Sequence, residues 1–114
     1  MNFKEEVKEG IIHLKLEGDL IGENNGPGIL EAINDQVNKG HTKAVIDISE
    51  VRYMNSSGIG VLITVLTKLR NKGGEVVLQN PSEQVKKLLV ITKLNNIFNV
   101  FDSEEEAVSF LQSA

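Results

Sequence analysis

Short apolar runs typical of strands alternate along this chain with longer segments whose apolar residues recur at helical spacing. The clearest run covers residues 44–48, a β-branched and nearly continuous apolar stretch expected of a central strand that is covered on both faces. Residues 11–17 alternate between apolar and polar, which predicts a strand with one wet face. Residues 75–79 and 98–101 predict two more strands, and residues 3–7 predict a first strand in a hairpin.

Four segments between and after these strands have helical patterns. We expect a loop over residues 18–28, which are rich in Gly, Asn and Pro, and then a helix up to Gly40. A second helix follows Asn55 and ends before Gly73. A third is predicted with Asn80 as its cap, Pro81 in its first position and Glu83 completing the cap. Ser103 and Glu106 form a capping box that opens the fourth.

The predicted order of elements is ββαβαβαβα, which favours one α/β domain over residues 1–114. Right-handed crossover connections place most of the strands in parallel register. We therefore expect a mixed, mainly parallel sheet of about five strands. Because the second strand has a polar face, the helices are expected mainly on one face of the sheet.

Composition excludes several classes of function. The chain has 114 residues, a net charge of −4 and no cysteine. The negative charge argues against direct contact with nucleic acid or an anionic membrane, and the missing cysteine excludes disulfides, zinc–thiolate clusters and thiol nucleophiles. The start of the sequence has no signal-peptide pattern, and the longest apolar stretch, residues 59–66, is too short to span a bilayer. We expect a cytoplasmic protein.

Residues with catalytic potential are few. His13 and His41 have no partner at metal-ligand spacing, so both are interpreted as structural, and Glu104–106 as favouring a helix N-terminus. Gly58-Ile59-Gly60 is not a dinucleotide loop, because Ile63 occupies the position where that motif has glycine. Gly58 and Gly60 instead predict close contact between a helix start and a strand. The sequence therefore predicts no metal, no cofactor and no enzymatic activity.

Three capping-type residues, Asn55, Ser56 and Ser57, stand together at the start of the second helix. One of them is enough to cap the helix. The spare hydroxyls lie at the positive end of the helix dipole, where a phosphate of about −1.5 to −2 charges would be stabilised. Both interpretations, a simple cap and a phosphorylation switch, stay open on the residues alone.

The stretch DISEVRYMNSSGIGVL, residues 47–62, resembles the signature of STAS domains of the anti-sigma factor antagonist type. The resemblance extends over nearly the whole chain. It implies a protein that binds an anti-sigma factor with ATP-dependent serine kinase activity, is released on phosphorylation and is reset by a PP2C-type phosphatase. The family's phosphoacceptor is the first hydroxyl of its motif, which is Ser56 here, with Ser57 as the alternative.

Two departures from the family pattern concern the partner surface. Asn55 stands where the family often has Asp, and residues 19–22 lack a later Asp found in some members. Residues expected to contact the partner are Asp19, Leu20, Asn24, Asn55, Ser56, Ser57 and Gly58. The alternative function is a non-switching STAS scaffold subunit of a transport ATPase or of a sensory complex.

Overall fold

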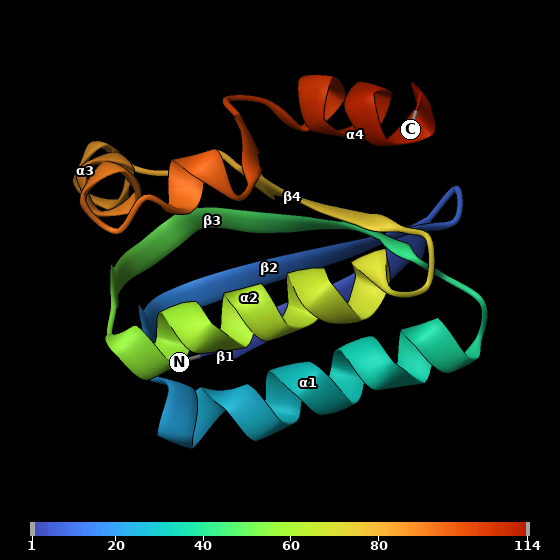
Figure 1. The fold of residues 1–114 in the computed structure, drawn as a ribbon, viewed down its shortest axis with the longest axis horizontal. Helices are drawn as coiled ribbons and strands as arrows, with labels where there is room; N and C mark the ends of the chain where they lie inside the picture. The colour runs from blue at the N-terminus through green and yellow to red at the C-terminus, as the bar shows by residue number, and fades with distance from the viewer. Residues whose placement is uncertain (1, 114) are drawn as a thin grey trace.

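A five-stranded sheet forms the centre of the computed structural model, which describes residues 2–113 (Figure 1). The strands lie side by side in chain order. The first two, β1 (Asn2–Lys8) and β2 (Ile11–Leu20), are antiparallel, while β3 (Lys43–Met54), β4 (Glu75–Gln79) and β5 (Asn99–Phe101) continue parallel to β2. The predicted mixed, mainly parallel α/β sheet is confirmed.

Three of the four helices cover one face of this sheet. They are α1 (Gly22–Asn38), α2 (Ser56–Arg70) and α3 (Glu83–Ile91), the last followed by a short 3₁₀ turn, η1 (Leu94–Asn96). Because each crossover leads to the next strand in the same direction, right-handed connections place all three on one side. The fourth helix, α4 (Glu104–Ser113), follows the last strand and lies on the opposite side (Figure 1). We call these sides the front face and the back face.

The main core lies between the front face and α1–α3. Its strand residues alternate along the sheet, as the period of a strand requires. Fully buried among them are Ile12, Leu14, Leu16, Ile46, Ile48 and Leu78, which meet Ile29, Ile33, Leu62, Leu69, Val85 and Leu89 of the helices. A smaller cluster on the back face joins Ile11, Val45 and Val77 to Ala107 and Leu111 of α4. The predicted preference of the helices for one face is thus confirmed.

The first helix begins earlier than the sequence predicted. Residues 18–28 were expected to form a loop, but β2 continues to Leu20 and α1 begins at Gly22. The Ile21 carbonyl accepts hydrogen bonds from the backbone N–H groups of Asn24 and Asn25, and the Asn25 side chain accepts one from the Ile21 N–H at 2.9 Å. These local bonds form the first helical turn despite the unfavourable composition.

The start of the third helix also differs from the prediction. Its cap is Ser82, whose hydroxyl accepts a hydrogen bond from the Val85 N–H at 3.2 Å. Asn80 has a φ of +55°, and its N–H bonds the Phe101 carbonyl at 2.8 Å, so this residue belongs to the turn after β4. Pro81 therefore precedes the helix. By contrast, the cap predicted at Ser103 is confirmed, because the Ser103 hydroxyl accepts from the Glu106 N–H. The Glu106 carboxylate accepts from the Ser103 hydroxyl at 3.1 Å, in place of the backbone bond that would complete a capping box.

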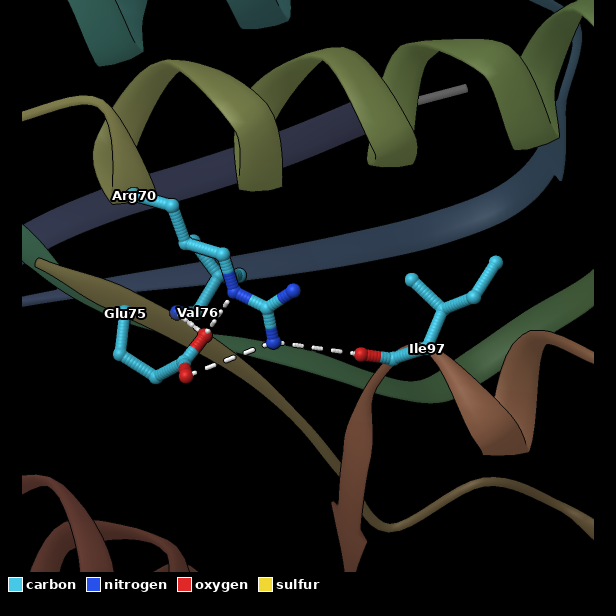
Figure 2. Close-up of polar contacts among 4 residues, drawn as sticks. All are labelled: Arg70, Glu75, Val76 and Ile97. Carbon is cyan, nitrogen blue, oxygen red and sulfur yellow. Dashed lines mark hydrogen bonds and ion pairs between the residues drawn. The ribbon is translucent and has the colours of Figure 1, made fainter.

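A polar cluster connects the end of α2 to the start of β4 and to the segment before β5 (Figure 2). The Arg70 guanidinium pairs with both carboxylate oxygens of Glu75, at 3.0 and 3.4 Å, and donates to the Ile97 carbonyl at 3.3 Å. Glu75 also accepts from the Val76 N–H at 3.0 Å. The fork of donors on arginine lets one side chain join α2, the first residue of β4 and the segment before β5.

Candidate functional site

The junction between β3 and α2 holds the three capping-type residues singled out in the sequence. Asn55 is the N-cap of α2, and its Oδ1 accepts a hydrogen bond from the Gly58 N–H at 2.8 Å. Its own N–H donates to the Leu20 carbonyl at 3.2 Å, which fixes the start of α2 to the end of β2. The capping role predicted for Asn55 is confirmed, so neither serine is needed as the cap.

Ser56 and Ser57 lie in different environments. Ser57 is half-buried, and its hydroxyl donates to Glu23 Oε2 at 2.6 Å, with Asn55 Oδ1 also within 3.0 Å. We assign the single hydroxyl proton to Glu23, because that contact is shorter and a charged acceptor forms the stronger bond. Ser56 is exposed, and its hydroxyl makes no hydrogen bond with any residue of the range 2–113. Of the two, Ser56 has the more accessible hydroxyl.

Glu23 is a residue of this site that sequence reasoning missed. It lies in the first turn of α1, where it accepts the Ser57 hydroxyl and, at 3.4 Å, the side-chain amide of Asn55. The Ser57 hydrogen bond, followed by one from its own backbone and one from Asn55, holds the pKa of Glu23 below its usual value. Little in the sequence indicates this role, because Glu23 lies in the segment predicted as a loop and 34 residues before Ser57.

Three glycines allow the backbones at this junction to approach closely. A Cβ on Gly58 would collide with the Leu20 carbonyl oxygen, and one on Gly22 would collide with the backbone of Ser57. A Cβ on Gly26 would lie 2.9 Å from a methyl group of Val61. The predicted contact role is therefore correct for Gly58. It is wrong for Gly60, where an added Cβ has no neighbour within 4 Å.

The residues predicted to contact a partner divide into two groups. Asp19, Asn24, Asn55, Ser56 and Ser57 are exposed or half-buried, whereas Leu20 and Gly58 are buried. The side chain of Leu20 packs in the core, so in this structure it supports the surface from beneath and cannot itself reach a partner. We name the exposed part the α2-start surface, defined by Asp19, Glu23, Asn24, Arg52, Tyr53, Asn55, Ser56 and Ser57.

The edge of this surface has both charge and an exposed aromatic ring. Arg52 lies 3.3 Å from Asp19 Oδ2, in an ion pair between neighbouring strands. Tyr53, at the end of β3, is 51% exposed although it is a large side chain next to the core. Exposed tyrosine and arginine side chains are common at the centres of protein interfaces. Tyr53 and Arg52 are thus the two residues of the α2-start surface whose types are enriched at protein interfaces.

Comparison with known proteins identifies the family. A family model described as STAS domain matches residues 2–107. The chain belongs to the STAS domain family. The anti-sigma-B factor antagonist of Listeria monocytogenes is 32% identical to this STAS domain over 109 residues, which are 93% of this chain and 95% of that protein.

Solved structures of similar proteins have the same architecture. A Thermotoga maritima protein assigned as an anti-sigma factor antagonist has a TM-score of 0.86 and 26% identity, covering 96% of this STAS domain and 94% of its own chain. The Bacillus protein SpoIIAA is known in an unphosphorylated form, with a TM-score of 0.75, and in a phosphorylated form, with 0.73. The unphosphorylated form is 22% identical and covers 99% of this chain and 100% of its own. The phosphorylated form is 24% identical and covers 95% of this chain and 97% of its own. At these identities, SpoIIAA shows the shared fold.

The two histidines of this STAS domain lie in β2 and in the segment between α1 and β3. His13 lies on the back face, with Nδ1 3.8 Å from a carboxylate oxygen of Glu104, a partner that the sequence did not reveal. Burial, and then the charge of Lys8, lower the pKa of His13, while Glu104 and Glu6 oppose this shift. The backbone N–H of His41 donates to the Gln36 carbonyl at 3.0 Å, just after α1.

Residues 2–113 contain no group of three or more His, Asp or Glu side chains placed to hold a metal ion. Over the same residues, no helix has both the length and the apolar character required to cross a bilayer.

Proposed function

We propose that this STAS domain is an anti-sigma factor antagonist whose binding is switched by phosphorylation of Ser56. The observation that supports the proposal best is the contrast between the two serines. Ser56 presents an exposed, unbonded hydroxyl beside the N-terminus of α2, whereas the Ser57 hydroxyl is bonded to Glu23. The Listeria relative, similar over nearly its full length, supports the class of partner.

The unphosphorylated protein binds an anti-sigma factor through the α2-start surface. Free N–H groups and the helix dipole already stabilise negative charge at this helix end, so a phosphate on Ser56 leaves the fold intact. The same phosphate adds about −1.5 to −2 charges to the centre of the surface and must lose water when a partner docks. Binding is therefore weakened by charge and desolvation, without unfolding.

The phosphate comes from the anti-sigma factor, acting as a serine kinase. The Ser56 oxygen attacks the γ-phosphorus of ATP, the bond to the β-phosphate oxygen breaks, the hydroxyl proton leaves, and ADP is released. A PP2C-type phosphatase hydrolyses the phosphoserine with water and restores the hydroxyl. The protein then acts in the cytoplasm, where its partners and ATP are present.

Asn55 gives the acceptor a neutral neighbour in place of the family's frequent Asp. A phosphate on Ser56 then has one fewer carboxylate beside it, while the cap of α2 is retained through Asn55 Oδ1. We expect phosphoserine at this position to be well tolerated by the helix. Ser57 remains the alternative acceptor.

The test uses the purified protein with a serine-kinase anti-sigma factor from the same genome and ATP. Mass spectrometry of the products is expected to place one phosphate on Ser56, with none in Ser56→Ala and undiminished labelling in Ser57→Ala. Ser56→Asp is expected to weaken binding of the anti-sigma factor at least tenfold while its melting temperature stays close to that of the wild type. Phosphate absent from both serines, together with stable binding to a permease-associated ATPase or sensory complex, would support the scaffold function instead.

A further inference from the structure

A second site lies on the back face of the sheet, away from the α2-start surface. A cavity of about 390 Å³ opens there, beside the first residue of α4. The volume is within the range of pockets that bind small molecules, roughly 300–1,000 Å³. Helix α4 covers the apolar residues of this face, from Ile11 across to Val77. Polar and charged residues beyond its N-terminus line the cavity.

The floor of the cavity is a row of four polar side chains in register across the sheet. Lys4 pairs with Lys15, Lys15 with Asp47, and Asp47 with Gln79 on successive strands. All four line the cavity. The row therefore has two cations at one end and a carboxylate next to an amide at the other.

The Gln79 side chain places a buried hydrogen-bond acceptor at one end of this row. The residue is only 3% exposed, and its Oε1 has no hydrogen-bond partner within residues 2–113. Its Nε2 lies 3.5 Å from Asp47 Oδ2, which favours this orientation of the amide, because the reverse would bring two acceptor oxygens together. A buried acceptor without a partner is costly to a fold, so the site calls for a hydrogen-bond donor in the cavity.

The two charged ends of the row do not satisfy each other. Lys15 and Asp47 are register partners on neighbouring strands, yet no ion pair joins them among the residues that the structure describes. From residues 2–113, the Asp47 carboxylate accepts only the Ser49 N–H at 2.9 Å and the long contact from Gln79. By contrast, Lys8 and His13 at the other edge of the cavity both lie near Glu104, at 3.6 and 3.8 Å.

We infer that this cavity binds a small zwitterion of amino-acid size. Its ammonium group donates to Gln79 Oε1 and Asp47, and its carboxylate accepts from Lys15 and Lys4. The lining has both signs of charge, with three lysines and the carboxylates of Glu5, Glu6, Asp47 and Glu104. A purely anionic ligand would leave the Gln79 oxygen without a donor, and a purely cationic one would give Lys4 and Lys15 no acceptor. Lys15 and Asp47 are register partners one strand spacing apart, roughly 5 Å, so a ligand that bridges them needs its two charges separated by at least about that distance, and the long side chain of Lys4 can reach the same carboxylate.

The test is an NMR titration of the full chain with 4-aminobutyrate, whose four-carbon skeleton separates an ammonium from a carboxylate. Butyrate and n-butylamine share that skeleton and each lack one charge, so they serve as matched ligands. We expect 4-aminobutyrate to shift the backbone amide signals of residues 15, 47 and 79 with saturable behaviour. The two controls should bind at least about tenfold more weakly, as the loss of a charged hydrogen bond predicts.

Two variants locate the binding. Gln79→Leu removes the acceptor without leaving a polar atom buried, and Lys15→Met removes one cation. Each is expected to weaken binding about tenfold or more, whereas Lys39→Met, at an exposed position outside the cavity, leaves it unchanged. The inference is overturned if butyrate binds as well as 4-aminobutyrate, if the shifted signals lie elsewhere, or if no zwitterion shifts them and Gln79 binds only water.

Discussion

Two glycines in the same helix provide the sharpest test of how the α2-start surface is built. Gly58 and Gly60 are both inside α2 and differ in what surrounds them. At Gly58 an added Cβ would collide with the Leu20 carbonyl oxygen and lie 3.0 Å from the Leu20 carbonyl carbon and Cγ. At Gly60 it would meet no atom within 4 Å. The same change, glycine to alanine, should therefore have opposite effects.

The expected magnitudes follow from two competing terms. Alanine is favoured over glycine in a helix interior by about 0.7 kcal/mol, which Gly60→Ala should gain in full. Gly58→Ala gains the same amount, but overpacking against a backbone carbonyl that cannot move aside costs about 3 kcal/mol, for a net loss of about 2 kcal/mol. At about 2.1 cal/mol/K of unfolding entropy per residue, these values correspond to about +3 °C and −8 °C in melting temperature for this chain.

Thermal and urea unfolding of both variants, followed by circular dichroism, measure the difference directly. A lower urea midpoint with an unchanged slope would show that Gly58→Ala changes stability and not the unfolded state. If Gly58→Ala is as stable as the wild type, the close approach of α2 to β2 is not required, and the explanation given for this junction is wrong. A loss of stability in Gly60→Ala would equally contradict it.

Three further changes have expected outcomes. Asn55→Ala should lower the free energy of unfolding by about 1 kcal/mol because the cap of α2 is lost, while Asn55→Asp, which can still cap, should retain it in the same urea titration. Arg70→Ala should cost about 1 kcal/mol or less, because the pair with Glu75 is partly exposed; a loss as large as that of Gly58→Ala would refute this. Since the pKa of His13 is lowered in the folded protein, the unfolded chain binds its proton first, and stability should fall as the pH drops below the unfolded value of about 6.5. His13→Gln should flatten that part of the stability–pH curve, and an unchanged curve would show that His13 does not contribute.

Elements whose signals are local could be predicted from the sequence. The strand at Glu75–Gln79, the cap at Asn55 and the cap at Ser103 all depend on residues within a few positions of one another. The start of α1 could not be predicted in this way, because Gly22 and Gly26 were interpreted as loop residues. In the structure their missing side chains make room for Ser57 and Val61, which lie more than 30 positions later. Composition alone does not distinguish a glycine that breaks a helix from one that lets two helices touch.

At the candidate site, too, only the residues with local signals could be predicted from the sequence. Asn55, Ser56 and Ser57 adjoin one another, and their place at a helix start follows from the apolar stripe behind them. Glu23 and the burial of Leu20 depend on how β2 and α1 meet α2, which no local pattern records. The row of Lys4, Lys15, Asp47 and Gln79 could not be predicted either, because its residues come from four strands and only the register brings them together.

The contrast between the serines also determines what modification of each would do to the fold. A phosphate on Ser57 would replace the proton that now bonds Glu23 at 2.6 Å and place two like charges in contact. The hydrogen bond that lowers the pKa of Glu23 is lost on this modification, but a glutamate carboxylate is ionised at neutral pH without it, so protonation does not relieve the repulsion. Ser57 phosphorylation is therefore expected to weaken the contact between the first turns of α1 and α2, whereas a phosphate on the exposed Ser56 lies in solvent and leaves the Glu23 contact in place. For the proposed switch, which alters binding but preserves the fold, the outer serine is thus the expected acceptor, while the hydroxyl of the inner serine joins the first turns of the two helices through Glu23.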